Sequence, residues 1–380
     1  MIPRTLFGPE HEEFRRQFRR FLEQEVTPNR KRWEAQQHVD RDIWKRAGEL
    51  GFLCTAIPEE YGGAGGDRLY STILIEEAAY ACDSSLGFAL HSDICAPYIL
   101  NFGTDEQKRH WLPKLASGEV ISAIAMTEPG TGSDLQAVKT TAVADGDDYV
   151  INGSKIFITN GYLSDLVIVV AKTGGSGKGS QDISLILVEA DRPGFTKGRP
   201  LEKIGMKGQD TAELFFSDVR VPRSNLLGSV EGQGFIMLMK ELAWERMIIA
   251  ITSQAAAETS WRLAKDYTDQ RNVFGKPVAA YQNTRFKLAE MRAEIAIGRV
   301  FVDRCLELVL KNALAPDAAA AAKFWITEMQ SRVTDQCLQL HGGYGYMLEY
   351  PIARIYADTR AQRIYGGTNE IMRELVARFM

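Results

Sequence analysis

The chain has 380 residues, of which 45% are hydrophobic and 25% are charged, as is usual for folded globular proteins with two or three domains. Its formal net charge of −4 provides no strong positive field, which disfavours nucleic acid as a partner. The five cysteines are scattered without a Cys-x-x-Cys pair, which predicts unpaired thiols in a reducing compartment. No segment approaches about 18 uninterrupted apolar residues and no signal-peptide core follows Met1, so we expect a cytoplasmic protein without an integral membrane segment.

The first third of the chain has a helical pattern from residue 9 to about residue 117. Four apolar residues fall on one face of its first helix: Phe14, Phe18, Phe21 and Leu22. The turn-rich segment 58–66 interrupts the pattern, and Thr104 is a predicted helix N-cap. We therefore predict an N-terminal helical domain over residues 1–119.

Near residue 120 the hydrophobic period shortens toward 2, which is typical of strands. Short β-branched runs predict strands over residues 120–125, 149–151, 155–158, 166–170, 183–188 and 212–216. Asp145-Gly146 and Asn152-Gly153 have the composition of tight hairpin turns, and residues 174–180 predict a surface loop. The sequence therefore predicts a central antiparallel β-barrel or sandwich domain over residues 120–231.

The helical period returns after residue 234 in long stretches. The predicted helices cover residues 235–270, 280–312 and 317–340, followed by a shorter one after Thr368. They indicate a C-terminal four-helix bundle domain over residues 232–380. Because helices and strands are segregated along the chain and do not alternate, the fold class is predicted as α+β and not as a doubly wound parallel sheet.

Several familiar functional motifs are absent from the sequence. It contains no G-x-G-x-x-G fingerprint, no Walker A lysine after a glycine loop and no H-E-x-x-H, and its five histidines are far apart. We therefore predict neither a Rossmann dinucleotide site nor a metal site.

Three other segments carry turn formers and hydrogen-bonding groups. Residues 126–134 form a predicted loop with hydroxyls and free backbone N–H groups, residues 155–161 form a strand with an aromatic side chain, and residues 365–371 contain a glycine pair before Thr368. In this order and spacing they resemble the acyl-CoA dehydrogenase flavoprotein family over essentially the whole chain. The resemblance is strongest to the long-chain branch and next to the isovaleryl-CoA branch. Supporting segments are residues 58–63, 270–276, 339–346 and 349–351.

The resemblance implies an FAD-dependent oxidoreductase that dehydrogenates acyl-CoA thioesters to trans-2-enoyl-CoA. It also implies that electrons pass to an electron-transferring flavoprotein, that the substrate is a medium-chain, long-chain or branched acyl-CoA of fatty-acid β-oxidation, and that the protein is a homo-oligomer, expected to be a tetramer. Two alternatives stay open on the same fold. One is a flavin oxidase or monooxygenase, and the other is a catalytically silent protein that binds flavin or acyl-CoA.

The position of the catalytic base distinguishes the branches of this family. Most members carry a glutamate directly after the tyrosine of the last motif, where this chain has Gly366. Resemblance to the long-chain branch assigns the base to Glu245 instead, and leaves the Gly366 N–H as a donor to the thioester oxygen. Three helical neighbours of Glu245 are apolar: Leu242, Ile248 and Ile249. They predict a desolvated carboxyl with a raised pKa, whereas the alternative is an ordinary surface carboxylate.

The resemblance assigns further residues to the cofactor and the substrate. The predicted FAD contacts include Met126, Thr127, Ser133, Phe157, Thr159, Phe274, Thr368 and Glu370. The part that resembles a neighbouring subunit's contribution comprises Arg271, Gln282, Gln339, Gly342 and Gly343. The predicted substrate contacts are Ser133, Ala243, Arg246, Tyr365, Gly366 and Gly367. Residues 86–99 are expected to line the acyl end, where Gly87, Ala89 and Ser92 would leave space.

Simpler alternatives exist for four of these residues. Phe157 could be a core residue, Arg271 a surface ion-pair partner, Gln339 a polar residue on a helix face and Arg246 a structural ion-pair partner.

Overall fold

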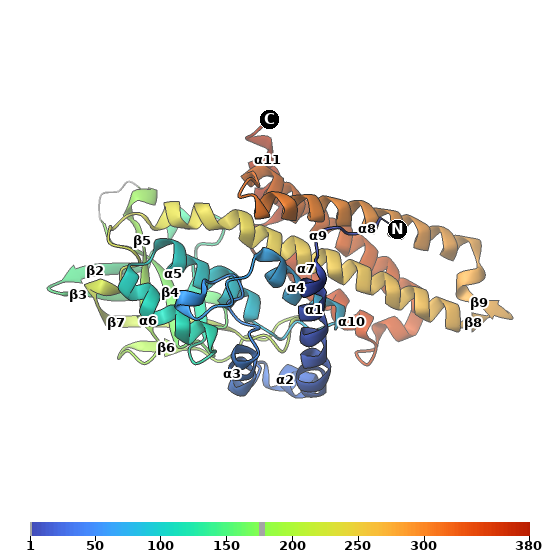
Figure 1. Ribbon diagram of the computed structural model, residues 1–380, viewed down its shortest axis with the longest axis horizontal. Helices are drawn as coiled ribbons and strands as arrows, with labels where there is room; N and C mark the ends of the chain where they lie inside the picture. Colours follow the sequence, from blue (N-terminus) through green and yellow to red (C-terminus); the bar gives the residue numbers. More distant parts are fainter. Residues whose placement is uncertain (1, 175–178) are drawn as a thin grey trace.

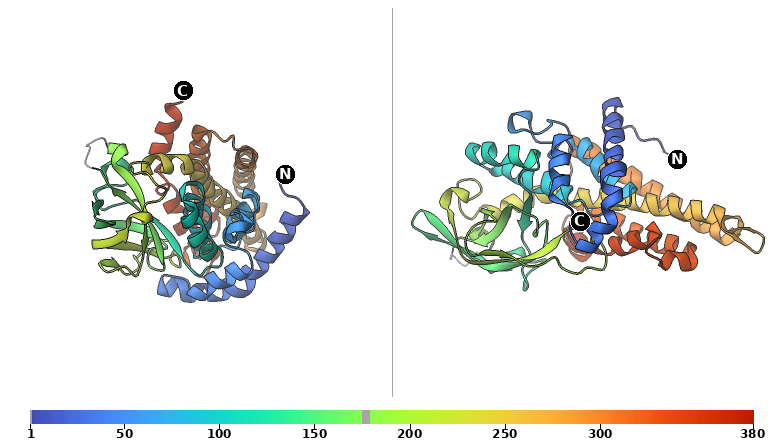
Figure 2. Two further views of the ribbon diagram at one scale, coloured as in Figure 1. Left: turned by 60° about the vertical axis from the view of Figure 1, so that its left-hand side comes forward. Right: turned by 90° about the horizontal axis from the view of Figure 1, so that it is seen from below.

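The computed structural model describes residues 2–174 and 179–380, so residues 175–178 of the predicted loop over 174–180 lie outside the described residues. Figure 1 shows an elongated molecule in which α7 (Gly234–Gln270) runs along the long axis, from beside the sheet to the β8–β9 hairpin. Figure 2 shows α7 between the N-terminal helices and α10. The three parts of the chain therefore meet along one helix.

The N-terminal part is helical, as predicted. Its α-helices are α1 (Pro9–Phe21), α2 (Arg30–Gln36), α3 (Arg41–Glu49), α4 (Arg68–Tyr80), α5 (Ala96–Phe102) and α6 (Asp105–Ala116). Two π-helical segments, η1 (Leu22–Val26) and η4 (Leu90–Cys95), and two 3-10 segments, η2 (Thr27–Asn29) and η3 (Glu59–Tyr61), connect them. Phe18 and Phe21 are buried on the predicted face of α1, and the Thr104 hydroxyl accepts a hydrogen bond from Gln107 N at 3.3 Å as the predicted N-cap of α6.

The central part is one curled sheet of seven strands in the order β1-β4-β2-β3-β7-β6, with β5 paired to β4. The strands are β1 (Ser122–Ala125), β2 (Thr141–Asp145), β3 (Asp148–Thr159), β4 (Leu166–Lys172), β5 (Ile183–Glu189), β6 (Phe195–Lys197) and β7 (Thr211–Pro222). Most pairs are antiparallel, but β1 and β2 each pair with β4 in parallel. The sheet is therefore predominantly antiparallel, as predicted, with two parallel pairs that involve β4. β4 can run parallel to β1 because the hairpin of β2 and β3 lies between them in the chain.

The two predicted hairpin turns have different outcomes. Asp145 pairs with Asp148 across Gly146, whose φ of +61° closes the predicted turn between β2 and β3. The second prediction is wrong, because Asn152 and Gly153 lie inside β3, where the register with β7 shifts. A Cβ at Gly153 would stand 2.4 Å from Thr140 Oγ1, so glycine is needed there for a close approach at a bulge.

The C-terminal part is helical. Besides α7 it contains α8 (Gln282–Leu310), α9 (Pro316–Leu340), α10 (Pro351–Gln362) and α11 (Asn369–Ala377). Short elements join the helices and strands of the chain: β8 (Asn272–Val273), β9 (Lys276–Pro277) and 3-10 segments at Leu135–Ala137, Gly179–Asp182, Arg223–Asn225, Val278–Ala280 and Gly342–Tyr346. The three long helices agree with the predicted ranges, whereas α10 was not predicted. Helices α7, α8 and α9 share one apolar core that includes Met247, Ile326 and Val302.

Two observations bear on the predicted absences. Within residues 2–174 and 179–380, no helix is long and apolar enough to cross a membrane. In the same ranges, no cluster of three or more His, Cys, Asp or Glu residues could hold a metal ion.

The first half of α7 contacts β5, η4 and α5, and η4 in turn contacts β1. This junction joins the sheet to both helical parts, and it contains the residues described next.

Candidate active site

Glu245 lies on α7 at this junction and is only 7% exposed. Tyr98 on α5 donates a hydrogen bond from its hydroxyl to Glu245 Oε1 at 2.9 Å. Burial raises the pKa of Glu245 to about 7, and the nearby charge of Glu241 acts in the same direction. The desolvation predicted from its apolar neighbours is thus confirmed, and the surface alternative is wrong. A carboxyl with this pKa can accept a proton near neutrality.

Gly366 packs against α7 one turn beyond Glu245. Its φ is +65° and that of Gly367 is +86°, so both glycines are in the left-handed region. A Cβ at Gly366 would stand 2.2 Å from Ile249 Cδ1, a distance at which one of the two groups must move. A side chain at position 366 would therefore have to displace the end of the Ile249 side chain, and the buried carboxyl at this place comes from Glu245.

A buried lysine, Lys323 on α9, holds the glycine loop. Its Nζ donates to Gly367 O at 2.7 Å and to Asn369 Oδ1 at 3.0 Å. The side chain is fully buried, and burial lowers its pKa to about 8. Thr368 then begins α11 as its N-cap, as predicted. Lys323 was not among the predicted site residues, although a single lysine at the end of an alanine run on an otherwise apolar helix face could have revealed it.

Met126 and Thr127 follow β1 and lie beside Phe157 of β3, because Ile156 N donates to Thr127 O at 2.9 Å. Phe157 is 64% exposed and has a φ of +61°, so the alternative of a core residue is wrong. Thr159 is half-buried at the end of the same strand. The structure thus brings two of the three motif segments to one edge of the sheet.

A buried ion pair under this edge was also missed. Lys155 Nζ donates to Glu128 Oε1 at 2.9 Å, to Met126 O at 3.2 Å and to Val170 O at 2.7 Å. Thr140 N donates to the same carboxylate at 2.9 Å. Burial lowers the pKa of Lys155 to about 8, against the opposing effect of Glu128. The pair fixes the backbone of the loop that carries Met126.

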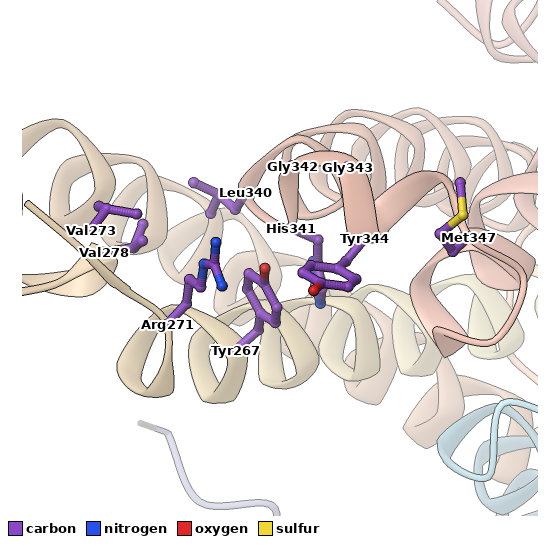
Figure 3. Close-up of a pocket in the computed structure, with 10 residues that line it drawn as sticks. All are labelled: Tyr267, Arg271, Val273, Val278, Leu340, His341, Gly342, Gly343, Tyr344 and Met347. Carbon is purple, nitrogen blue, oxygen red and sulfur yellow. The ribbon is translucent and has the colours of Figure 1, made fainter.

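A second group of predicted residues surrounds a cavity of about 480 Å³ at the far end of α7 (Figure 3). Its lining consists of Tyr267, Arg271, Val273, Val278, Leu340, His341, Gly342, Gly343, Tyr344 and Met347. The Arg271 guanidinium carbon lies 5.9 Å from the centre of the Tyr344 ring. A Cβ at Gly342 or Gly343 would meet nothing within 4 Å, so the backbone there is open to a ligand. Phe274, in the adjoining hairpin, is 98% exposed.

The two groups do not meet within one chain. Arg271 follows the last turn of α7, and the helix from residue 245 to residue 271 is roughly 39 Å long at ~1.5 Å per residue. Gln282 and Gln339 are exposed near the Arg271 end, at the start of α8 and the end of α9.

The remaining predicted contacts differ in exposure. Arg246 is buried, and its Nε has no hydrogen-bond partner in the part of the chain that the structure describes. Ala243 is half-buried, whereas Ser133, Tyr365 and Glu370 are exposed.

Two of the residues expected to leave room for an acyl chain are used in packing. A Cβ at Gly87 would stand 1.8 Å from Asn160 Oδ1, and the Ser92 hydroxyl accepts a hydrogen bond from Cys54 N at 2.9 Å. Their small size therefore serves close contacts, and the expectation is corrected for both.

Comparison with known proteins agrees with this architecture. The family models for the N-terminal, middle and C-terminal domains of acyl-CoA dehydrogenases match residues 8–119, 123–219 and 232–380. The mitochondrial long-chain specific acyl-CoA dehydrogenase of Sus scrofa is 52% identical over 99% of this chain and 87% of its own length.

Solved structures give the same result. The crystal structure of an acyl-CoA dehydrogenase from Geobacillus kaustophilus superposes with a TM-score of 0.97 at 50% identity, covering 99% of each chain. A glutaryl-CoA dehydrogenase from Mycobacterium smegmatis in complex with FADH2 has a TM-score of 0.91 at 29% identity, covering 98% of this chain and 95% of its own. The three family models match this chain in order, and a relative is more than half identical over 99% of it. This chain therefore belongs to the acyl-CoA dehydrogenase family.

Proposed function

We propose that this protein is an FAD-dependent acyl-CoA dehydrogenase that oxidises acyl-CoA thioesters to trans-2-enoyl-CoA, with Glu245 as the base. The observation that carries the proposal is the buried Glu245 carboxyl, with a pKa near 7, one helical turn from the left-handed Gly366 loop. Family membership supports the reaction class.

In this mechanism Glu245 accepts the proton from the carbon next to the thioester. The apolar side chains around it, including Ile248 and Ile249, exclude water and keep its pKa raised. The Gly366 N–H is assigned to the thioester oxygen, where a donor stabilises the negative charge that develops as the proton leaves. When bound, the flavin supplies the acceptor for the hydride of the β-carbon, so that one proton and one hydride depart and a double bond forms.

The exposed residues fit FAD. Phe157 offers an aromatic face beside the loop of Met126 and Thr127, and Thr159 supplies a hydroxyl at its rim. We assign Ser133, Thr368 and Glu370 to further FAD contacts, and Phe274, in the hairpin beside Arg271, to the FAD of a neighbouring copy. We assign Ala243, Arg246, Tyr365 and Gly367, together with Ser133, to the acyl-CoA. The buried, unpartnered Arg246 Nε supports a ligand contact more than the alternative of a structural ion pair.

The second group supports an oligomer. The residues of this group are Arg271, Gln282, Gln339, Gly342 and Gly343. Arg271 lies roughly 39 Å along α7 from Glu245, at ~1.5 Å per residue, which is too far for both to serve one flavin within one chain. The group can instead serve the flavin of a neighbouring copy. A guanidinium beside open glycine backbone suits a diphosphate. We therefore propose a homotetramer in which each FAD is bound by two copies.

Other parts of the proposal concern boundaries and context. We propose domains over residues 1–119, 120–231 and 232–380, supported by the ranges of the three family models. We propose a medium-chain, long-chain or branched acyl-CoA of fatty-acid β-oxidation as substrate, and the name of the long-chain relative supports a long acyl chain. As acceptor we propose an electron-transferring flavoprotein. The scattered cysteines, all unpaired and most of them buried, support a reducing compartment such as the cytoplasm.

The test is an anaerobic titration of the purified yellow protein with acyl-CoAs of graded length, monitored by flavin absorbance. We expect bleaching and formation of the trans-2-enoyl-CoA. The reduced enzyme should then be reoxidised faster by an electron-transferring flavoprotein than by air. Faster reoxidation by air would favour an oxidase, and the absence of bleaching with every acyl-CoA would refute the dehydrogenase proposal.

A further inference from the structure

Tyr98 lies outside the sequence motifs, has no role in the mechanism proposed above, and donates a hydrogen bond to the proposed base, Glu245. It lies on α5, which follows the π-helical segment η4 without a break. The side chain is fully buried, and its hydroxyl donates to Glu245 Oε1 at 2.9 Å across 147 residues of sequence. A π-helical turn changes which side chains of the following helix face a neighbour, and such turns are frequent at functional sites.

The hydrogen bond treats the two carboxylate oxygens differently. In the described ranges 2–174 and 179–380, Tyr98 is the only donor that hydrogen-bonds to the Glu245 carboxylate, and it occupies Oε1. Oε2 is left for an incoming proton. A donor to a carboxylate also favours the charged form, which is the form that can act as a base.

We propose that Tyr98 is a positioning residue for the base: it fixes Oε1 of Glu245, directs Oε2 to the substrate and stabilises the charged carboxylate. The inference rests on the proposed function, since it assigns a role in the same proton transfer.

The other ionisable groups around Glu245 do not replace this role. Burial raises the pKa of the Tyr98 phenol and of the Cys95 thiol on η4, so both stay protonated near neutral pH. On α7, the charge of Glu241 raises the pKa of Glu245, and the charge of Arg246 lowers it. Tyr98 is thus the neutral donor that offsets part of the effect of burial.

A purely structural alternative can be separated from this role. Asn101, one turn after Tyr98, donates to Glu241 Oε1 at 2.8 Å, so α5 contacts two glutamates one turn apart on α7. These contacts could merely fix how α5 packs on α7. In that case, loss of the Asn101 side chain would change the pH dependence of flavin reduction as much as loss of the Tyr98 hydroxyl. If Tyr98 positions the base, the larger effect belongs to Tyr98.

The test is Tyr98→Phe in the assembled, flavin-loaded enzyme, which removes the hydroxyl and keeps the ring. The rate of flavin reduction at saturating acyl-CoA is measured anaerobically across pH. For the wild type, the rate rises with pH as Glu245 loses its proton. Loss of a hydrogen bond to a charged group should move this rise about one pH unit higher, which lowers the rate about tenfold on the acid side and restores it at high pH.

Two matched controls define the result. Tyr149→Phe removes another tyrosine hydroxyl, which donates from β3 to Glu231 in the turn before α7, and Asn101→Ala removes the second contact between α5 and α7. Tyr149→Phe should not move the pH profile, and Asn101→Ala should move it less than Tyr98→Phe does, because Asn101 contacts Glu241 and not the base itself. Infrared titration of the Glu245 carboxyl in resting enzyme, assigned with Glu245→Gln, should show the same upward shift for Tyr98→Phe without turnover.

An unmoved profile or carboxyl titration in Tyr98→Phe would overturn the inference, as would an equal shift in Asn101→Ala. These outcomes leave the proposed function intact as long as acyl-CoA bleaches the wild-type flavin. If acyl-CoA bleached no wild-type flavin at any pH, the proposed function would fail, and this inference with it.

Discussion

Gly366→Ala tests whether the glycine loop and α7 fit as closely as the structure indicates. The new Cβ would stand 2.2 Å from Ile249 Cδ1 on a backbone with a φ of +65°. A left-handed conformation costs an alanine roughly 1–2 kcal/mol. Gly366 is only half-buried, and Ile249 Cδ1 is the end of a flexible side chain, so moving it aside should cost roughly 0.5–1.5 kcal/mol more. We therefore expect the free energy of unfolding to fall by about 1.5–3.5 kcal/mol.

Two other glycines separate these contributions. Gly146 has a φ of +61° but no atom within 4 Å of an added Cβ, so Gly146→Ala should lose only the backbone part, about 1–2 kcal/mol. Gly130 has neither a positive φ nor a neighbour, and Gly130→Ala should stay within about 0.5 kcal/mol of the wild type.

Urea unfolding followed by fluorescence, at one fixed protein and flavin concentration, measures all three variants. Adding Ile249→Val removes the Cδ1 that the new methyl would meet, so the double variant Gly366→Ala with Ile249→Val should be more stable than the sum of the two single effects. The reasoning fails if Gly366→Ala is as mild as Gly130→Ala, or if Ile249→Val gives no such recovery.

Three further predictions follow from buried ionisable groups. Glu245→Gln should slow flavin reduction by acyl-CoA by about 10²–10⁴-fold in stopped-flow absorbance, and a wild-type rate would exclude it as the base. Lys155→Met leaves the Glu128 carboxylate buried without its cation. Urea unfolding should show a free energy of unfolding lower by about 3–5 kcal/mol, and a loss below about 1 kcal/mol would contradict a stabilising ion pair at this place. Burial lowers the pKa of His91 from 6.5 to about 4, so the unfolded state binds a proton more readily than the folded state. The free energy of unfolding should therefore fall by up to about 3 kcal/mol as the pH drops from about 6.5 to 4. His91→Gln should flatten that part of the stability profile, and an unchanged slope would assign it to other groups.

The sequence pattern within a few residues was sufficient to predict helices and one hairpin turn. The long helices α7, α8 and α9 follow from periodicity, and the turn at Gly146 follows from turn chemistry. Gly153 shows the limit, because the same Asn-Gly pair forms a bulge when a distant strand, β7, pairs with both of its flanks. No local rule distinguishes these two uses.

The candidate site shows the same division. The apolar helical neighbours of Glu245 predicted its burial, since they are close in sequence. Tyr98 and Lys323 were missed because their partners, Glu245 and Gly367, lie on other elements. The small size of Gly87 was read as space for a ligand, yet it serves contact with Asn160, because small residues permit close packing as readily as cavities.

The contact between Gly366 and Ile249 also restricts how this chain can change over generations. A side chain at position 366 would meet the Ile249 methyl on a left-handed backbone. A smaller residue at position 249, or another rotamer of Ile249, would make room for it. Substitutions at the two positions are therefore expected to be coupled, so that each is tolerated according to the residue present at the other.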